Sequence, residues 1–165
     1  MESIITIATV LTMYFNAAND VNAPFMYNSD LEDGVIHKVA VYEKKTDNQL
    51  CAKMEYRYSY DEQGRLTSRE VLRWNENKKQ WENDFRHTYK YYNNGYNMES
   101  SKWDAQQNSY DLPFKVTLYR EVAPSVTSVK TFKMNAAKDN MYLTDRMLCM
   151  ESLEQISNHL IATMN

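Results

Sequence analysis

The sequence predicts a mainly β protein: an antiparallel up-and-down meander of about eight strands with one C-terminal amphipathic helix. Three observations predict this fold. The chain has 165 residues, about one domain, and holds 13 Tyr, 5 Phe and 3 Trp, side chains that fit a pleated, half-buried surface. Its three glycines recur about every 30 residues. Between them, apolar and polar residues alternate as in strands with one wet face.

The first element is an apolar leader. Ile4–Phe15 contains no charged residue, and its 12 residues are fewer than the ~20 that span a bilayer. Such a segment is typical of a signal peptide core, and the small residues that follow allow cleavage after Ala18, although no basic residue precedes it. We predict a signal peptide over residues 1–18, a single β-repeat domain over 19–165, and an extracytoplasmic location: periplasmic, cell-surface or secreted. The alternative is a buried first strand.

Two grids of turn residues divide the rest of the chain. Gly34, Gly64 and Gly95 stand on the first grid with Ser125 at its next position, and each follows turn-forming residues. Glycine suits these sites because a tight hairpin needs a positive φ. On the second grid, large apolar residues open and close polar loops: Trp74 and Trp81, Trp103 and Tyr110, Met134 and Met141.

Two turns per repeat leave two strands per repeat. In Leu50–Tyr60 every second residue is apolar or aromatic, and the residues between are mostly polar. The predicted strands are Val35–Glu43, Leu50–Tyr60, Arg65–Trp74, Trp81–Tyr92, Tyr96–Trp103, Tyr110–Glu121, Val126–Met134 and Met141–Met150. They are expected to form an open curved sheet or to close in a barrel-like way.

The last element changes period. Leu153, Ile156, Leu160 and Met164 are three or four residues apart, which indicates one apolar stripe of a helix over about 151–163. Ser152 and Gln155 form a capping-box pattern at its start. Its polar face has no Lys or Arg, so it is expected to pack on the sheet's apolar face and not on an anionic membrane.

One hairpin carries a resemblance. Tyr58–Thr67 (YSYDEQGRLT) resembles a YD repeat, the β-hairpin unit of bacterial cell-surface and toxin-encapsulating shells, and Tyr89–Gly95 is a degraded second copy. Over its whole length the chain resembles small secreted proteins of unknown function from gut anaerobes of the Bacteroides group. The resemblance implies an exported hairpin-repeat protein and transfers no catalytic residue.

The sequence contains no reaction motif. Its three histidines lack ligand spacing, and it has no Cys-x-x-Cys, Gly-x-Ser-x-Gly or phosphate-binding glycine loop. We therefore predict no catalytic residue, no cofactor, no metal and no enzymatic activity. The alternative is an extracytoplasmic hydrolase acting on glycans or peptides, with Asp61, Glu62, Asp84 and Glu99 as the available carboxylates.

A binding function suits the composition of the chain better than an enzymatic one. Trp74, Trp81, Trp103 and Tyr110 are the candidate ligand-binding residues, because flat rings pack on sugars or apolar side chains. The alternative is cross-strand pairing without a ligand. A protein or glycan partner is expected, with an edge-strand homodimer as a further option.

The net charge and the number of cysteines bear on nucleic-acid binding, membrane insertion and disulfide formation. A net charge of −3 offers no basic excess to nucleic acid, and stable membrane insertion of the mature chain is not expected. Outside the cytoplasm, Cys51 and Cys149 can form the one disulfide available; the alternative is two small buried apolar residues.

Overall fold

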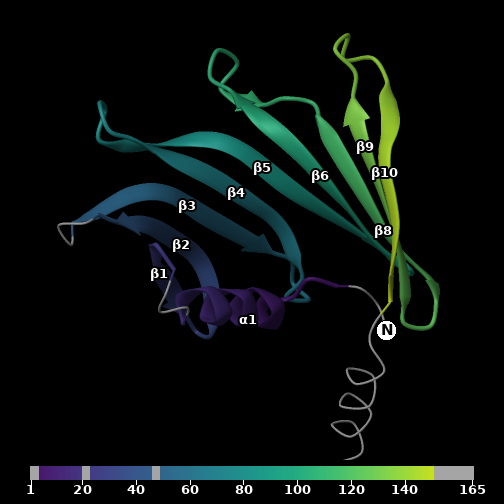
Figure 1. Cartoon of the computed structure of the whole chain (residues 1–165), viewed down its shortest axis with the longest axis horizontal. Coiled ribbons are helices and arrows are strands. Elements are labelled where there is room, and N and C mark those ends of the chain that lie inside the picture. The colour runs from purple at the N-terminus through teal and green to yellow at the C-terminus, as the bar shows by residue number, and fades with distance from the viewer. Residues whose placement is uncertain (1–3, 20–22, 46–48, 151–165) are drawn as a thin grey trace, which may run out of the picture.

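The computed structural model describes residues 4–19, 23–45 and 49–150. One ten-stranded antiparallel sheet runs through it as an open, strongly curved meander, with a helix against one face (Figure 1). The elements in chain order are α1 (Ile7–Ala18), β1 (Phe25–Glu32), β2 (Val35–Lys44), β3 (Leu50–Tyr60), β4 (Leu66–Asn75), β5 (Gln80–Tyr92), β6 (Gly95–Asp104), β7 (Ser109–Tyr110), β8 (Lys115–Ala123), β9 (Val126–Met134) and β10 (Met141–Met150). Strands pair in chain order, with β1 and β10 at the edges and β7 as a short partner of β6.

The mainly β meander is confirmed, with two differences in its strands. β1 was not predicted, because Phe25–Glu32 is an edge strand with mostly exposed side chains and weak alternation. The predicted strand Tyr110–Glu121 is interrupted between β7 and β8, because Pro113 has no N–H to donate to a neighbouring strand. Around it, the amides of Asp111 and Phe114 still donate to the carbonyls of Lys102 and Ser100, both at 2.9 Å.

The predicted hairpin grid is confirmed by the backbone. Gly34, Gly64 and Gly95 have φ values of +80°, +70° and +143°, and Ser125 adopts +61° at the fourth position. Gly95 also meets a close approach, since a Cβ there would overlap the carbonyl oxygen of Tyr119 on β8. The second grid is also a set of turns, in which the side chains of Asn75, Asp104 and Asn135 accept hydrogen bonds from backbone amides two to five residues later.

The helix that the structure describes is N-terminal, and not C-terminal as predicted; the predicted helix over 151–163 lies outside the described residues. α1 occupies the segment that the sequence analysis identifies as a leader. Its start is fixed by a capping box between Thr6 and Thr9. The preceding residues join the sheet, because Ile5 accepts a hydrogen bond from the amide of Leu66 at 2.8 Å. This N-terminal segment is therefore hydrogen-bonded to the β3–β4 hairpin in the structure.

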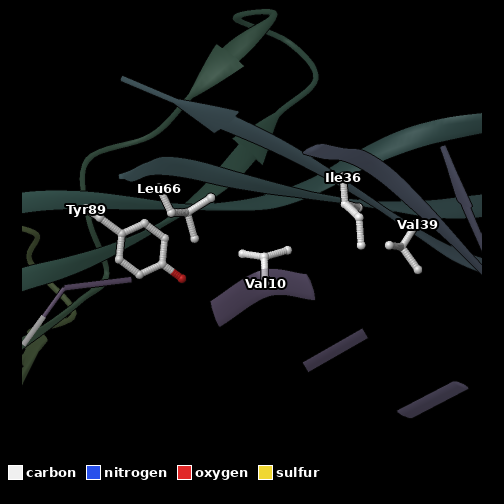
Figure 2. Close-up of a cluster of buried hydrophobic side chains, with 5 residues drawn as sticks. All are labelled: Val10, Ile36, Val39, Leu66 and Tyr89. Atoms are coloured by element: carbon white, nitrogen blue, oxygen red, sulfur yellow. The ribbon is translucent and has the colours of Figure 1, made fainter. Parts of the chain in front are cut away.

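The core lies between α1 and the inner face of the curved sheet. Val10 is 3% exposed and points from the helix toward four buried side chains of the sheet (Figure 2). These are Ile36 and Val39 of β2, Leu66 of β4 and Tyr89 of β5. The face of the sheet that α1 covers is thus apolar where the helix lies, as amphipathic packing requires.

Candidate functional site

Tyrosines gather on the sheet face that carries α1, which we call the tyrosine face. They project there because side chains alternate along each strand, so that Tyr56, Tyr58 and Tyr60 of β3 share one side. Tyr89 belongs to the buried cluster, and the other members pack around it or stack on its neighbours: Tyr27, Tyr56, Tyr58, Tyr60, Tyr91, Tyr96 and Tyr119.

The rings of this cluster contact one another across strands. Tyr96 and Tyr119 are stacked, with ring centroids 4.5 Å apart and planes inclined by 17°. Tyr96 also lies 5.9 Å from Tyr91 and 6.1 Å from Tyr89, centroid to centroid. Such ring pairs add specific packing energy to the area they bury. These ring contacts run from β5 through β6 to β8.

The tyrosine hydroxyls are donors in this setting. Burial raises the pKa of Tyr58, Tyr60 and Tyr91 to about 12, so their hydroxyls stay protonated at neutral pH. Tyr60 donates to the carbonyl of Ile36 at 2.9 Å, and Tyr91 to that of Leu66 at 2.8 Å. These hydroxyls hold the backbone or offer hydrogen bonds and are not poised as bases.

A row of basic and polar side chains crosses the same face. Strand register places five residues opposite one another in turn, and we call them the basic row: Arg69 (β4), His87 (β5), Ser100 (β6), Lys115 (β8) and Lys133 (β9). Arg69 is itself opposite Tyr58, and directly opposed residues share a face, so the row lies on the tyrosine face.

The centre of the basic row is a hydrogen-bonded pair. His87 Nδ1 lies 2.8 Å from the hydroxyl of Ser100, which is only 1% exposed. Burial, together with the positive charges of Arg69 and Lys115, lowers the pKa of His87 to about 4. The imidazole is therefore uncharged at neutral pH, with a cation on either side.

The four predicted binding residues form two separate pairs. Trp74 and Trp81 meet edge to face with centroids 5.1 Å apart, and Trp103 and Tyr110 do the same at 4.9 Å. All four are half-buried. Trp103 and Tyr110 lie away from the tyrosine face, since Tyr110 is covered at 4.3 Å by Arg86, the neighbour of His87 that points to the opposite side. In the structure each pair thus joins the two ends of one hairpin loop, and we call the two pairs the loop clamps. Their role in binding stays a prediction.

The predicted disulfide is not present. Cys51 and Cys149 are both free, and they lie on β3 and β10 with five strands of the sheet between them. Six strand spacings of about 4.8 Å separate these strands, whereas a disulfide needs Cα atoms within about 7 Å. In the open sheet the two cysteines are thus far apart. Cys149 is exposed and Cys51 half-buried.

Three of the four carboxylates considered for hydrolysis have structural partners, and the fourth, Glu62, is exposed. Asp61 accepts from the amides of Gln63 and Arg65 and pairs with the Arg65 guanidinium at 2.7 Å, and these contacts lower its pKa. Asp84 pairs with Arg73, and Glu99 with Lys90 at 2.8 Å. Among the described residues, no group of three or more His, Cys, Asp or Glu is placed to hold a metal ion. Within that same part of the chain, no helix is long and apolar enough to cross a membrane.

Neither the tyrosine face nor the basic row was predicted as a site from the sequence. The alternation in Leu50–Tyr60 already indicated one row of tyrosines. The basic row depends on register across five strands, which hairpin lengths alone leave uncertain wherever a bulge shifts the pairing, as between Ser59 and Tyr60.

Comparison with known proteins places this architecture among proteins of unknown function. The model described as "Family of unknown function (DUF3836)" matches residues 1–121. A crystal structure of a protein of unknown function from Bacteroides fragilis is 25% identical, with a TM-score of 0.67, and the match covers 77% of this chain and 93% of that one. A DUF3836 protein from Bacteroides vulgatus is 29% identical, with a TM-score of 0.52, over 55% of this chain and 91% of its own. No curated protein matches the chain.

Proposed function

Because this chain belongs to the DUF3836 family of unknown function, we propose a role for it from its own residues: an exported, non-enzymatic binding module. The tyrosine face is its binding surface, and its partner is a protein or a glycan outside the cytoplasm. Once the leader is removed, this face becomes accessible along its whole length.

Export is supported by the N-terminal segment. Residues 4–15 carry no charge, and small residues follow as far as Ala18. In the structure these residues form α1, which is joined to the sheet through Val10 and the hydrogen bond from the amide of Leu66 to the carbonyl of Ile5. Cleavage after Ala18 would leave Ile36, Val39 and Leu66, at present 4% exposed or less, open to a partner.

The single observation that carries the binding proposal is the seating of Val10 of α1 among buried residues of the tyrosine face. The face accepts an apolar element there, while its tyrosine hydroxyls offer hydrogen bonds beside it. Tyr and Trp are enriched in protein binding sites because one side chain combines both properties. An apolar surface of this kind on a mature protein is typical of an interaction site.

A non-enzymatic role is supported by the state of the reactive groups. The carboxylates Asp61, Asp84 and Glu99 are each held in a separate ion pair, and the imidazole of His87 is bound to Ser100. None of these pairs combines an acid and a base in one cleft, which hydrolysis of a glycosidic bond requires.

The test starts with the full chain expressed in a bacterium that exports proteins. N-terminal sequencing of the extracytoplasmic product is expected to begin at Asn19. The mature protein should then bind a dye for apolar surfaces more strongly than a variant retained with its leader, in which Leu11 and Val10 cover the face. A product that stays in the cytoplasm with Met1 intact would contradict export, and equal dye binding would contradict exposure of the tyrosine face.

A further inference from the structure

We propose that the basic row binds the carboxylate or sulfate groups of an acidic polysaccharide. This inference rests on the proposed binding function and names the ligand class of the tyrosine face. The site is the strip of the sheet from Arg69 on β4 to Lys133 on β9, with His87, Ser100 and Lys115 between them.

The positive charges of the basic row are not paired with carboxylates in the described structure. The chain as a whole is acidic, with a net charge of −3. Nine basic side chains form ion pairs with carboxylates in the described structure, and none of the nine belongs to the basic row. Asp145 stands opposite Thr131 in the neighbouring row, and no ion pair links it to Lys115 or Lys133 in the described part of the chain. Arg69, Lys115 and Lys133 thus have no ion-pair partner among the described residues.

Arg69 has a hydrogen-bond donor that the rest of the described structure leaves unused. Its Nε is buried and has no hydrogen-bond partner among the described residues. Its guanidinium lies 5.4 Å from the ring centre of Tyr56, which orients the planar group by a cation–π contact. A buried donor without a partner is costly, and a carboxylate or sulfate is the acceptor that a guanidinium binds best.

The middle of the basic row is the uncharged pair of His87 and Ser100. His87 and Ser100 are hydrogen-bonded to each other, and Phe85 packs edge to face on the imidazole with centroids 5.1 Å apart. This pair is held in place without a charge of its own. The pair lies between Arg69 and Lys115 and places no carboxylate between these two cations.

The shape of the site favours a polysaccharide over an acidic peptide. The row crosses five strands, which is about 19 Å at 4.8 Å per spacing. It follows the sheet at right angles to the strands, so a linear polymer with regularly spaced charges can lie along it. Rings and cations are neighbours, since Tyr58 is opposite Arg69 and Tyr56 lies beneath its guanidinium. An acidic sugar presents a ring and an anion on the same unit and matches both.

Titration calorimetry on the exported protein, whose N-terminus is determined as above, tests the proposal. The probes are polygalacturonate, which carries carboxylates, dextran sulfate, which carries sulfates, and neutral dextran. We expect binding of at least one of the two polyanions, weakened by added salt, and no binding of neutral dextran. Arg69→Gln is expected to weaken binding about tenfold, and the Lys115→Gln, Lys133→Gln double variant by a similar factor.

Lys130→Gln is the matched control. Lys130 lies next to Thr131 on β9 and points to the opposite face, so its loss removes the same charge outside the basic row. It should change affinity less than twofold. Because Arg69 is half-buried, thermal unfolding is measured for each variant, and the lysine double variant, in which Lys133 is exposed and Lys115 half-buried, keeps the test valid if Arg69→Gln unfolds.

The outcomes separate the ligand class from the broader function. An equal loss in Lys130→Gln and in Arg69→Gln, or half the logarithmic loss of the double variant in Lys130→Gln, would overturn the site, since binding would then follow total charge. Tight binding of neutral dextran would overturn the inference that the ligand is acidic, and it would not contradict the proposed binding function. Absence of all three interactions would overturn this inference alone, because export and exposure of the tyrosine face are measured separately by N-terminal sequencing and dye binding. An acidic peptide that outcompetes both polyanions would also overturn the polysaccharide.

Discussion

Gly95 at the start of β6 lies against the backbone of Tyr119 on β8, with no room for a side chain between them. The same two strands are joined by the stacked rings of Tyr96 and Tyr119, whose centroids are 4.5 Å apart. The close approach of the backbones and the ring stack therefore occur at one point of the sheet. This point connects the first three hairpins to the C-terminal part of the meander.

Substitution of Gly95 tests that close approach. In Gly95→Ala the new Cβ overlaps the carbonyl oxygen of Tyr119 at a φ of +143°, which L residues rarely adopt. We expect the free energy of unfolding to fall by about 3 kcal/mol. Gly34→Ala is the control, because Gly34 also has a positive φ but open space around it, and it should cost about 1 kcal/mol. Equal losses, measured by urea denaturation, would contradict the steric explanation.

Packing of α1 makes a second prediction. Val10→Ala in the full chain removes two methyl groups from a buried site and is expected to lower stability by about 2 kcal/mol. Met13→Ala on the same helix is the control, because Met13 is 59% exposed, and it should change stability by less than 0.5 kcal/mol. The comparison is made by chemical denaturation of protein that retains residues 1–18. If both variants unfold like the wild type, α1 does not pack on the sheet.

His87 predicts a dependence of stability on pH. Its pKa is about 4 in the folded protein and near 6.5 when unfolded, so the unfolded chain binds the proton more tightly. The neutral imidazole favours folding above pH 6.5, and this contribution is lost progressively as the pH falls from 6.5 toward 4. Between pH 7 and pH 5 the wild type should lose about 1–2 kcal/mol more than His87→Gln. Identical pH profiles for the two proteins would contradict a buried neutral imidazole.

The sequence supplied the repeat and most strand positions because these depend on local signals. Turn residues such as Gly64 and alternation within Leu50–Tyr60 act over a few residues, and both were confirmed. Contacts between distant segments were harder to anticipate. Nothing local indicates that Val10 meets Tyr89, or that Pro113 divides a strand whose alternation continues on either side of it.

The candidate site shows the same limit. The pairs Trp74–Trp81 and Trp103–Tyr110 were identified because each closes a single hairpin loop, and the structure does bring their rings together. The basic row combines side chains from five strands and needs the register of four strand pairs. Each β-bulge shifts that register by one residue, so the row follows only from the assembled sheet.

The loop clamps make a fourth prediction. Trp74→Ala removes an edge-to-face partner of Trp81 and should lower stability by about 1–2 kcal/mol, with loss of the near-ultraviolet dichroism of the coupled rings. Trp74→Phe keeps an aromatic ring and is the control, expected to recover about half of that loss. If Trp74→Ala leaves both stability and dichroism unchanged, the pair does not clamp the loop, and a binding role for Trp74 gains support.

The free cysteines make the last prediction. Since Cys51 and Cys149 lie on strands separated by five others, the folded monomer purified without reductant should contain two reactive thiols. Cys149 is on the exposed edge strand β10 and should react first with a thiol reagent, whereas the half-buried Cys51 should react more slowly. Mass spectrometry of the labelled protein counts the thiols, and Cys149→Ser assigns the fast phase. A monomer that is two hydrogens lighter and does not react would require β3 to approach the edge strand β10, contrary to an open meander.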